Sequence, residues 1–275
     1  MLLGTAGGPT PKAKSAAPAQ AIVVGDRIYL VDCGDGVARQ LTLANLAVKQ
    51  LRAVFVTHLH SDHIAGYGPL FLLGWTAGLA TPVDTHGPPP LTGMTAQLLE
   101  AYRYDIELRM ADEGRPPLGP LVRPHEILEG GEIFRDDRIR VTAAPNEHPP
   151  ISHSFAYRFD TPDRSIVVSG DTRYSDSVVR LARGADVLVH EVVSREYWER
   201  PDAPQPPSVV RHILASHTDA VDVGRVAAAA GVKTLVLSHF VPTEGPGAPT
   251  DSDWRAAVRR HFQGHVVVGR DLMEI

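Results

Sequence analysis

The chain has 275 residues, of which 43% are hydrophobic and 21% are charged, and this composition excludes disorder, collagen and a coiled coil as the main architecture. Lysine and arginine total 27 against 32 aspartate and glutamate, so the net charge is −5 and no basic surplus points to a nucleic-acid binder. The chain has 1 cysteine and 13 histidines. An intramolecular disulfide framework is therefore excluded, and any metal site must be built from imidazole and carboxylate.

The beginning of the chain carries no sign of a targeting segment. Residues 1–8 are too short and too glycine-rich for a secretory signal, and they lack a basic n-region. They are typical of the end of a first strand that runs into a Gly/Pro turn. No apolar run approaches the roughly 18 residues of a membrane span. We therefore expect a cytoplasmic protein, or a periplasmic or secreted one if an upstream leader has been removed.

The first half of the chain reads as strands and helices in alternation. Residues 21–32 predict a β-hairpin around Gly25 and Asp26, and a helical pattern follows over 37–48. Residues 52–57 form a short apolar run of buried-strand length. The stretch 86–124 holds two proline-rich breaks around a helical pattern at about 92–110. We expect a loop-helix-loop insertion over the scaffold there.

The second half predicts further strands at 139–144, 154–159, 165–169, 186–193, 234–238 and 265–268. Apolar strands end near aspartate at Asp32 and Asp171, and they end in Thr/Ser-His at His58 and His239. Open α/β sheets place ligands at the carboxyl ends of their strands. We therefore expect two β-rich layers, covered by helices, with metal-competent side chains at strand ends in both halves.

The strongest chemical signal is the segment 58–63, which reads His-Leu-His-Ser-Asp-His. It places three imidazoles and one carboxylate directly after a buried strand. A single tetrahedral zinc seldom draws four ligands from so short a stretch, so two metals are favoured. His58 and His60 would serve one metal, and Asp62 and His63 the other. The alternative is an exposed polar loop that happens to hold histidines.

This HxHxDH segment after an apolar strand resembles the signature of the metallo-β-lactamase-fold superfamily. The resemblance covers nearly the whole chain, and within the superfamily it is strongest to the ribonuclease Z and arylsulfatase-like branch. The matching segments, in that branch's order, include 4–9, 169–172, 190–191 and 215–218. The resemblance implies an α/β (α+β) fold. It would be a four-layer αββα metallo-β-lactamase sandwich, a single domain over 1–275 with the helical, proline-rich insertion at 86–124.

The resemblance also implies a dinuclear site with a complete set of ligands. His58, His60 and His148 would bind the first metal, and Asp62, His63 and His239 the second, with Asp171 bridging them. Taken alone, His148 reads as a surface-loop histidine, Asp171 as a turn or helix-cap residue, and His239 as a satisfied core histidine. Two Zn²⁺ ions are the first expectation, and Mn²⁺, iron or cobalt also suit these ligands.

The expected mechanism is hydrolysis, with a metal-bound hydroxide as nucleophile. The expected catalytic residues are Asp62, His217 and Glu191. His217 matches a family histidine that acts near the scissile bond, and Glu191 would orient it. The alternative is that His217 caps a helix expected over 219–230. Asp32 is expected to support the ligand loop by hydrogen bonding, and Cys33 to be a packing thiol.

Fold does not set the substrate, so the surrounding segments must indicate it. The loop 9–16 keeps two lysines but lacks the Arg-Asn pair of ribonuclease Z-type enzymes, and the long basic arm is absent. The arginines of 86–124 are balanced by acidic residues, which gives no support for a phosphate-gripping surface. We therefore expect a small anionic ester, either a phosphodiester or an aryl sulfate. A β-lactam or lactone is the first alternative, and ribonuclease Z-type cleavage of tRNA the second.

The expected partners follow from that substrate. They are a small-molecule anionic ester and a second copy of the chain, because similar proteins often dimerise. Nucleic acid is not favoured, and no membrane is expected. An aromatic wall for the substrate could come from Trp75, Tyr102, Tyr104 and Trp198, although each could equally pack in the core. A different class of function would be a non-catalytic relative or a two-iron redox protein. The redox reading also expects a carboxylate at a histidine position of the motif and a flavin-binding partner domain, and neither is present.

Overall fold

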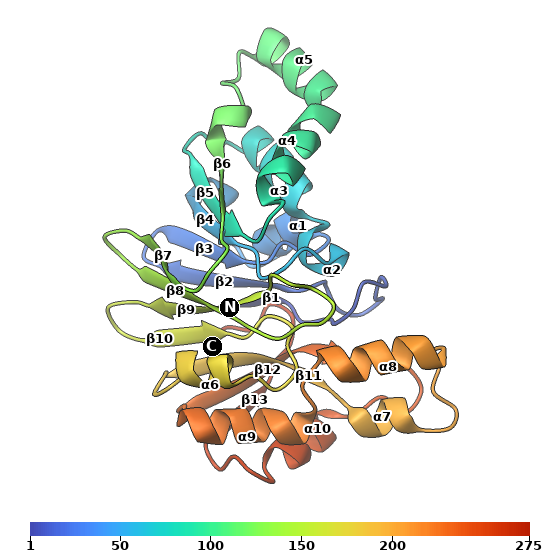
Figure 1. Cartoon of the computed structure of the whole chain (residues 1–275). Coiled ribbons are helices and arrows are strands. Elements are labelled where there is room, and N and C mark those ends of the chain that lie inside the picture. Colours follow the sequence, from blue (N-terminus) through green and yellow to red (C-terminus); the bar gives the residue numbers. More distant parts are fainter. The chain divides into compact units, whose positions relative to one another are not determined.

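The computed structural model describes every residue of the chain, from Met1 to Ile275. The chain forms two compact units, each built around one β-sheet (Figure 1). Unit 1 comprises Met1–Gly4, Ala16–Leu128 and Asp271–Ile275, and unit 2 comprises Thr5–Ser15 and Glu129–Arg270. The single domain expected over 1–275 stays a prediction.

Unit 1 contains a six-stranded sheet whose strands lie in chain order. The strands are β1 (Leu2–Gly4), β2 (Ala19–Val24), β3 (Arg27–Val31), β4 (Leu51–Phe55), β5 (Val83–Gly87) and β6 (Val122–Glu126). Neighbours from β1 to β3 pair antiparallel, and neighbours from β3 to β6 pair parallel. Because β3 and β4 are parallel, their carboxyl ends lie side by side at one edge. Asp32 and the histidine segment leave the sheet at that edge.

The helices of unit 1 are α1 (Val37–Leu43), α2 (Ser61–Ile64), α3 (Tyr67–Thr76), α4 (Leu91–Ala101) and α5 (Arg103–Glu113), with 3₁₀ turns at Val48–Gln50 and Gly119–Leu121. Side chains of α1 and α3 pack into the apolar core of the sheet. The Tyr67 hydroxyl of α3 donates to Thr85 Oγ1 of β5 at 3.0 Å and also contacts Thr95 of α4. These contacts fix α3 and α4 against the sheet.

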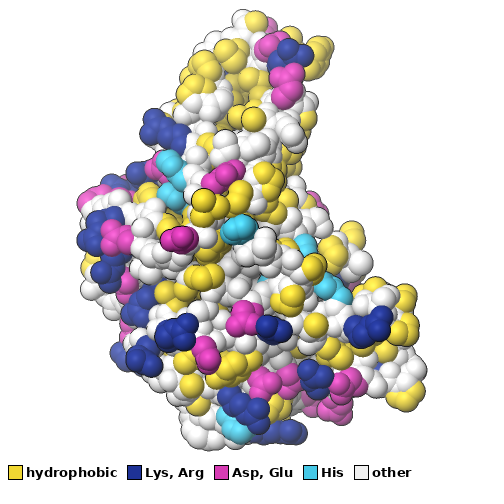
Figure 2. Space-filling view, in the orientation of Figure 1, with side chains coloured by type: hydrophobic (Ala, Val, Ile, Leu, Met, Phe, Trp, Pro, Cys, Tyr) yellow, Lys and Arg dark blue, Asp and Glu magenta, His cyan; other side chains and the backbone are white.

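Helix α5 differs from the others because it buries no residue. It lies farther from the sheet than α4 and carries its own ion pairs, in which Arg109 binds Asp105 and Glu113 (Figure 1). Figure 2 shows basic and acidic atoms side by side at this end of unit 1. The single helix expected at 92–110 is thus two helices, separated at Tyr102. The ends of the stretch 86–124 belong to the paired strands β5 and β6.

Unit 2 contains a seven-stranded sheet in the order β13-β12-β11-β10-β9-β8-β7. The strands are β7 (Gly131–Arg135), β8 (Arg140–Pro145), β9 (Phe155–Asp160), β10 (Ser165–Val168), β11 (Val187–Val193), β12 (Thr234–Val241) and β13 (His265–Val268). Neighbours from β7 to β10 pair antiparallel, and neighbours from β10 to β13 pair parallel. The carboxyl ends of β10, β11 and β12 therefore share one edge.

The helices of unit 2 are α6 (Asp176–Leu181), α7 (Arg195–Glu199), α8 (Pro207–Ser216), α9 (Ala220–Ala230) and α10 (Asp251–Val258). Helix α9 illustrates their origin in the sequence. Val223, Val226, Ala227 and Ala230 recur at helical spacing and are buried against Leu188 and Leu235 of the sheet. The Asp219 side chain caps the helix by accepting the Val221 N–H at 3.0 Å, and Gly231 ends it in the left-handed region.

Most elements expected from the sequence are present within a few residues of their predicted bounds. The hairpin turns at Gly25, whose φ of 62° requires a residue that tolerates the left-handed region. The helix expected over 37–48 ends earlier, at Leu43, and a 3₁₀ turn covers Val48–Gln50. No helix in the structure is long and apolar enough to cross a membrane.

Candidate metal centre and active site

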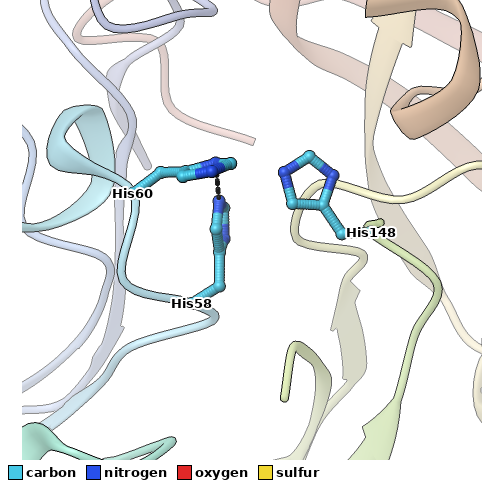
Figure 3. A group of neighbouring side chains, drawn as sticks. All are labelled: His58, His60 and His148. Atoms are coloured by element: carbon cyan, nitrogen blue, oxygen red, sulfur yellow. Dashed lines mark hydrogen bonds between the residues drawn. The ribbon is translucent and has the colours of Figure 1, made fainter. Parts of the chain in front are cut away.

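The histidine segment of unit 1 follows β4 and leads into the short helix α2. His58, Asp62 and His63 are buried and His60 is half-buried, so the segment is not an exposed polar loop. His58 Nε2 and His60 Nδ1 face each other at 3.0 Å (Figure 3). His63 Nε2 lies 3.6 Å from Asp62 Oδ2. The residues expected as ligands from this segment are therefore grouped as two neighbouring pairs.

Asp32 holds this segment from the end of β3. Its Oδ1 accepts the Thr57 N–H at 2.8 Å, and its Oδ2 accepts the Thr57 hydroxyl at 3.0 Å and lies 2.8 Å from His63 Nδ1. Asp32 reaches them from a left-handed backbone, with φ of 59°. These contacts agree with the expected supporting role of Asp32, and aspartate is among the few non-glycine residue types that tolerate positive φ.

The same hydrogen bonds assign the tautomers of two histidines. A carboxylate only accepts, so His63 Nδ1 carries the proton that Asp32 receives and His63 Nε2 keeps its lone pair. The Thr57 hydroxyl proton is used on Asp32, so Thr57 Oγ1 accepts from His58 Nδ1 at 3.1 Å. His58 Nε2 then keeps its lone pair and faces His60 Nδ1 at 3.0 Å. Both rings present the lone pair that a metal ion needs.

His148 shows the same arrangement in unit 2, with a backbone partner in place of a carboxylate. His148 is 1% exposed, and its Nδ1 donates to the Ser216 carbonyl oxygen at 2.9 Å. The bond leaves Nε2 with its lone pair. His148 is thus an oriented, buried imidazole and not a surface-loop histidine.

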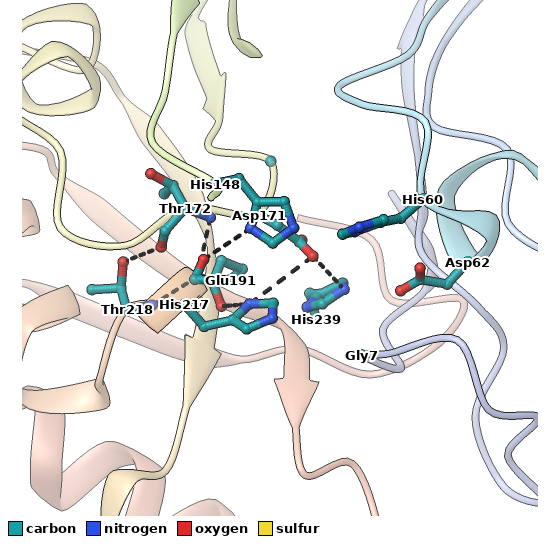
Figure 4. Close-up of polar contacts among 12 residues, drawn as sticks. Gly7, His60, Asp62, His148, Asp171, Thr172, Glu191, His217, Thr218 and His239 are labelled. Atoms are coloured by element: carbon teal, nitrogen blue, oxygen red, sulfur yellow. Dashed lines mark hydrogen bonds and ion pairs between the residues drawn. The ribbon is translucent and has the colours of Figure 1, made fainter. Parts of the chain in front are cut away.

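Asp171 and His239 lie together at the edge where β10 and β12 end (Figure 4). Asp171 follows β10 in a tight turn, caps no helix, and places Oδ2 at 3.2 Å from His239 Nε2. His239 is the extra residue of a β-bulge, because its neighbours Ser238 and Phe240 pair with consecutive residues of β11. With φ of 50°, the bulge turns the His239 ring toward Asp171.

Gly7 packs directly against the bulge. A Cβ added at Gly7 would lie 2.7 Å from the Phe240 carbonyl oxygen and 2.9 Å from His239 Nδ1. Contacts this short do not occur in real structures, so only glycine fits without a shift of the chain. The Gly7 N–H is bonded to Thr243 Oγ1 at 2.9 Å, which fixes the loop in place.

Buried Glu191 and half-buried His217 form a carboxylate–imidazole pair beside Asp171. Glu191 Oε2 lies 3.2 Å from His217 Nδ1, and Glu191 Oε1 accepts the Thr218 N–H at 2.8 Å (Figure 4). His217 Nδ1 is 4.0 Å from Asp171 Oδ2. The alternative role of His217 as a helix cap is wrong, because Asp219 caps α9 and the His217 ring is turned to Glu191.

Unit 2 by itself offers two groups of side chains that could hold a metal ion. The ligand atoms of His148, Asp171 and His217 lie within 4.8 Å of one another, and so do those of Glu191, His217 and His239. Imidazole and carboxylate donors suit zinc and other borderline metals. Four of the seven expected ligands (His58, His60, Asp62, His63) belong to unit 1 and three (His148, Asp171, His239) to unit 2. Their assignment to two shared ions stays a prediction.

The remaining expectations concern side chains outside this set. Cys33 is a packing thiol, as expected, because it is fully buried, and burial together with nearby Asp32 raises its pKa well above the ordinary value. Three of the four aromatic side chains considered for a substrate wall do not form one. Trp75 and Trp198 are buried in the apolar clusters of their own units, and Tyr104 is 82% exposed on α5.

One residue near the site has no role in the sequence-based expectations. His212, on α8, is exposed, and its ring centroid lies 6.5 Å from that of His148. Its Nδ1 is 3.4 Å from the Ser216 hydroxyl. The sequence could have indicated the contact between His212 and Ser216, because residues four positions apart share one face of a helix.

Comparison with known proteins agrees with this geometry. A family model described as a β-lactamase superfamily domain matches residues 27–240. The chain belongs to the metallo-β-lactamase-fold superfamily. It is 34% identical over 277 residues to ribonuclease Z of Mycobacterium bovis (strain BCG / Pasteur 1173P2), covering 100% of this chain and 96% of that one. Ribonuclease Z of Mycobacterium sp. (strain KMS) is 35% identical over 276 residues, covering 100% and 94%.

Solved structures of the superfamily share the fold. The metallo-β-lactamase fold protein YhfI from Bacillus subtilis matches with a TM-score of 0.72 at 23% identity, covering 98% of this chain and 95% of that chain. The short form of human tRNase Z matches with a TM-score of 0.69 at 21% identity, covering 99% and 96%. These similarities confirm the expected superfamily, its ribonuclease Z-like branch and the metallo-β-lactamase sandwich fold.

Proposed function

We propose that this superfamily hydrolase is a metal-dependent phosphodiesterase of the ribonuclease Z type, with RNA as its substrate class. The observation that supports the proposal is the Glu191–His217 pair, whose imidazole Nδ1 lies 3.2 Å from Glu191 Oε2 and 4.0 Å from Asp171 Oδ2. The full-length similarity to proteins named ribonuclease Z supports the choice of RNA over an aryl sulfate or a lactam.

We propose two Zn²⁺ ions as cofactors, and the donor chemistry fits them. His58, His63 and His148 each have Nδ1 engaged, which assigns the lone pair of the neutral ring to Nε2. Bound ions would supply a water of lowered pKa and stabilise charge that develops on the phosphoryl oxygens. The side chains proposed to hold them are His58, His60, His148, Asp62, His63, His239 and the bridging Asp171.

His217 would protonate the leaving oxygen from Nε2. Glu191 accepts at His217 Nδ1 and so fixes both the rotation of the ring and the position of its second nitrogen. Glu191 is itself held by the backbone N–H groups of Thr218 and Thr172, at 2.8 and 3.3 Å. This pair does the work of a general acid and its orienting carboxylate.

A smaller phosphodiester is the second candidate substrate, on the evidence of surface charge. An RNA-gripping surface needs basic side chains that are available to phosphates. On α5, however, Arg109 is paired with Asp105 and Glu113, and Arg115 beyond the helix is also paired with Glu113. These pairs favour a ligand that is recognised at the site itself.

The test is turnover of four substrates by the zinc-loaded protein. We expect hydrolysis of bis-p-nitrophenyl phosphate and of an RNA with a 3′ trailer, and no hydrolysis of p-nitrophenyl sulfate or nitrocefin. Hydrolysis of the aryl phosphodiester alone would favour the second candidate. Turnover of only the sulfate or only nitrocefin would refute the phosphodiesterase proposal. His58→Ala should abolish both zinc loading and activity, and retained activity would overturn the ligand assignment.

A further inference from the structure

His212 lies beside His148, on a helix that packs against the apolar interior of unit 2. Helix α8 packs through Val210, Ile213 and Leu214 against a buried cluster that contains Trp198. His212 lies on a different face of the helix and is exposed. Its ring centroid is 6.5 Å from that of His148, whose own ring is 5.3 Å from that of His217. His212 is thus one ring beyond the side chains proposed to act on the scissile phosphate.

Ser216 connects His212 to His148. The Ser216 carbonyl oxygen accepts the Nδ1 proton of His148, and the buried Ser216 hydroxyl donates to the Pro149 carbonyl oxygen at 2.5 Å. Because this hydroxyl has one proton and has used it, Ser216 Oγ can only accept from His212 Nδ1 at 3.4 Å. The network therefore assigns the proton of neutral His212 to Nδ1 and the lone pair to Nε2.

In this tautomer, Nε2 can only accept a hydrogen bond, so a ligand group that contacts it must be a donor. Around the scissile bond of a nucleic acid, the phosphate oxygens and the ester oxygens only accept. The donor nearest to the phosphate is the ribose 2′-hydroxyl, which is also the group that distinguishes RNA from DNA. An aryl phosphodiester has no such group.

We propose that His212 is a specificity-determining residue that accepts a hydrogen bond from the ribose hydroxyl next to the scissile phosphate. The inference rests on the proposed phosphodiesterase function and deepens it, because it makes a ribonucleotide the preferred substrate. A single hydrogen bond to an uncharged partner contributes a preference of about tenfold.

Binding provides a test that does not depend on turnover. Uridine 3′-monophosphate and 2′-deoxyuridine 3′-monophosphate are titrated into the zinc-loaded full chain by calorimetry. We expect the wild type to bind the ribonucleotide about tenfold more tightly, and His212→Ala to bind both alike. His212→Gln, which keeps an acceptor near the Nε2 position, should restore part of the preference. His261→Ala, which removes an exposed imidazole beside Arg225, is the matched control and should behave as the wild type.

Three outcomes would overturn the inference. Equal affinities in the wild type would show that the ribose hydroxyl is not read, and an unchanged preference in His212→Ala would assign it to another group. Loss of bound zinc in His212→Ala would make His212 a ligand instead. In each case hydrolysis of bis-p-nitrophenyl phosphate by the wild type would leave the phosphodiesterase proposal standing. Failure of that hydrolysis would reject the phosphodiesterase proposal and, with it, the inference that depends on it.

Discussion

Asp32 Oδ2 and His63 Nδ1 lie 2.8 Å apart, with both side chains buried. Asp32 directly follows β3, whereas His63 lies in helix α2, 31 positions further along the chain. The same carboxylate also receives the Thr57 N–H and hydroxyl. One side chain thereby sets the backbone of the histidine segment and the tautomers of His58 and His63.

Asp32→Asn should weaken zinc binding without unfolding the protein. The amide keeps an acceptor for the Thr57 N–H, but its NH₂ group cannot accept the proton of His63 Nδ1. Asparagine at position 32 therefore no longer favours the His63 tautomer that is protonated on Nδ1 and keeps its lone pair on Nε2. Loss of such a supporting group typically lowers metal affinity by about 10- to 100-fold. Competition with a chromophoric chelator measures the affinity.

Asp35→Asn serves as the matched control for this variant. Asp35 is exposed and lies three residues after Asp32. The control should retain wild-type zinc affinity. Equal affinities in Asp32→Asn and Asp35→Asn would mean that the carboxylate does not orient the histidines.

Gly7→Ala should lower activity through His239. The added methyl group has no room between the Phe240 carbonyl oxygen and the His239 ring, so the bulge or the loop must move. A displacement of about 1 Å can cost about 100-fold in rate. We expect kcat on bis-p-nitrophenyl phosphate to fall by roughly that factor. Gly93→Ala, on helix α4 with open space around its Cβ, should leave kcat unchanged.

Glu191→Gln should show its effect through the leaving group. The amide can still contact His217 Nδ1, but it no longer stabilises a protonated ring. General acid catalysis contributes typically about 10²- to 10⁴-fold. We expect a loss in that range on RNA, whose alkoxide leaving group needs a proton, and a much smaller loss on bis-p-nitrophenyl phosphate. Equal losses on both substrates would rule out a proton-donor role for the pair.

His86 should make stability depend on pH between about 6.5 and 4. Burial, and then nearby His125, lower its pKa to about 4, while Asp84 acts in the opposite direction. The neutral form is therefore favoured in the folded protein. Its contribution is complete above pH 6.5 and is lost as the pH falls toward 4, up to roughly 3 kcal/mol.

His86→Gln removes the titrating group and should flatten this dependence. Urea unfolding at pH 7.5 and 5.0 gives the change in free energy of unfolding for the wild type and the variant. His265→Gln, at an exposed position, should keep the wild-type dependence. A His86→Gln protein that loses as much stability as the wild type on acidification would contradict the assignment to His86.

The features that were predictable from the sequence are those encoded locally. The turn at Gly25, the strand before His58 and the amphipathic pattern of α9 each depend on residues close in the chain. The histidine segment was recognisable because its donors are adjacent. The sequence could not show the break at Tyr102 between α4 and α5. Helix α5 buries no residue, so it has no apolar face that would mark where it begins, and its side chains interact through ion pairs on the helix surface.

The site details that were missed depend on contacts between distant segments. His212 reads as a surface residue because nothing near it in sequence indicates that its helix ends beside His148. The bulge at His239 is also hidden, since a shift of one residue in strand register leaves the apolar run unchanged. The sequence also left open that His217 caps α9. Asp219 is the cap in the structure, and it is the stronger capping residue by type.

Asp32 and His239 both have a left-handed backbone, and at both positions the residue that the site needs costs conformational stability. Non-glycine residues in this region cost of order 1–3 kcal/mol each and persist only where the surrounding structure enforces them. Glycine would relieve that cost at either position while discarding the carboxylate or the imidazole. Selection for heat resistance alone would therefore favour variants that are more stable but inactive. Stabilised variants should be screened for turnover as well as for heat resistance.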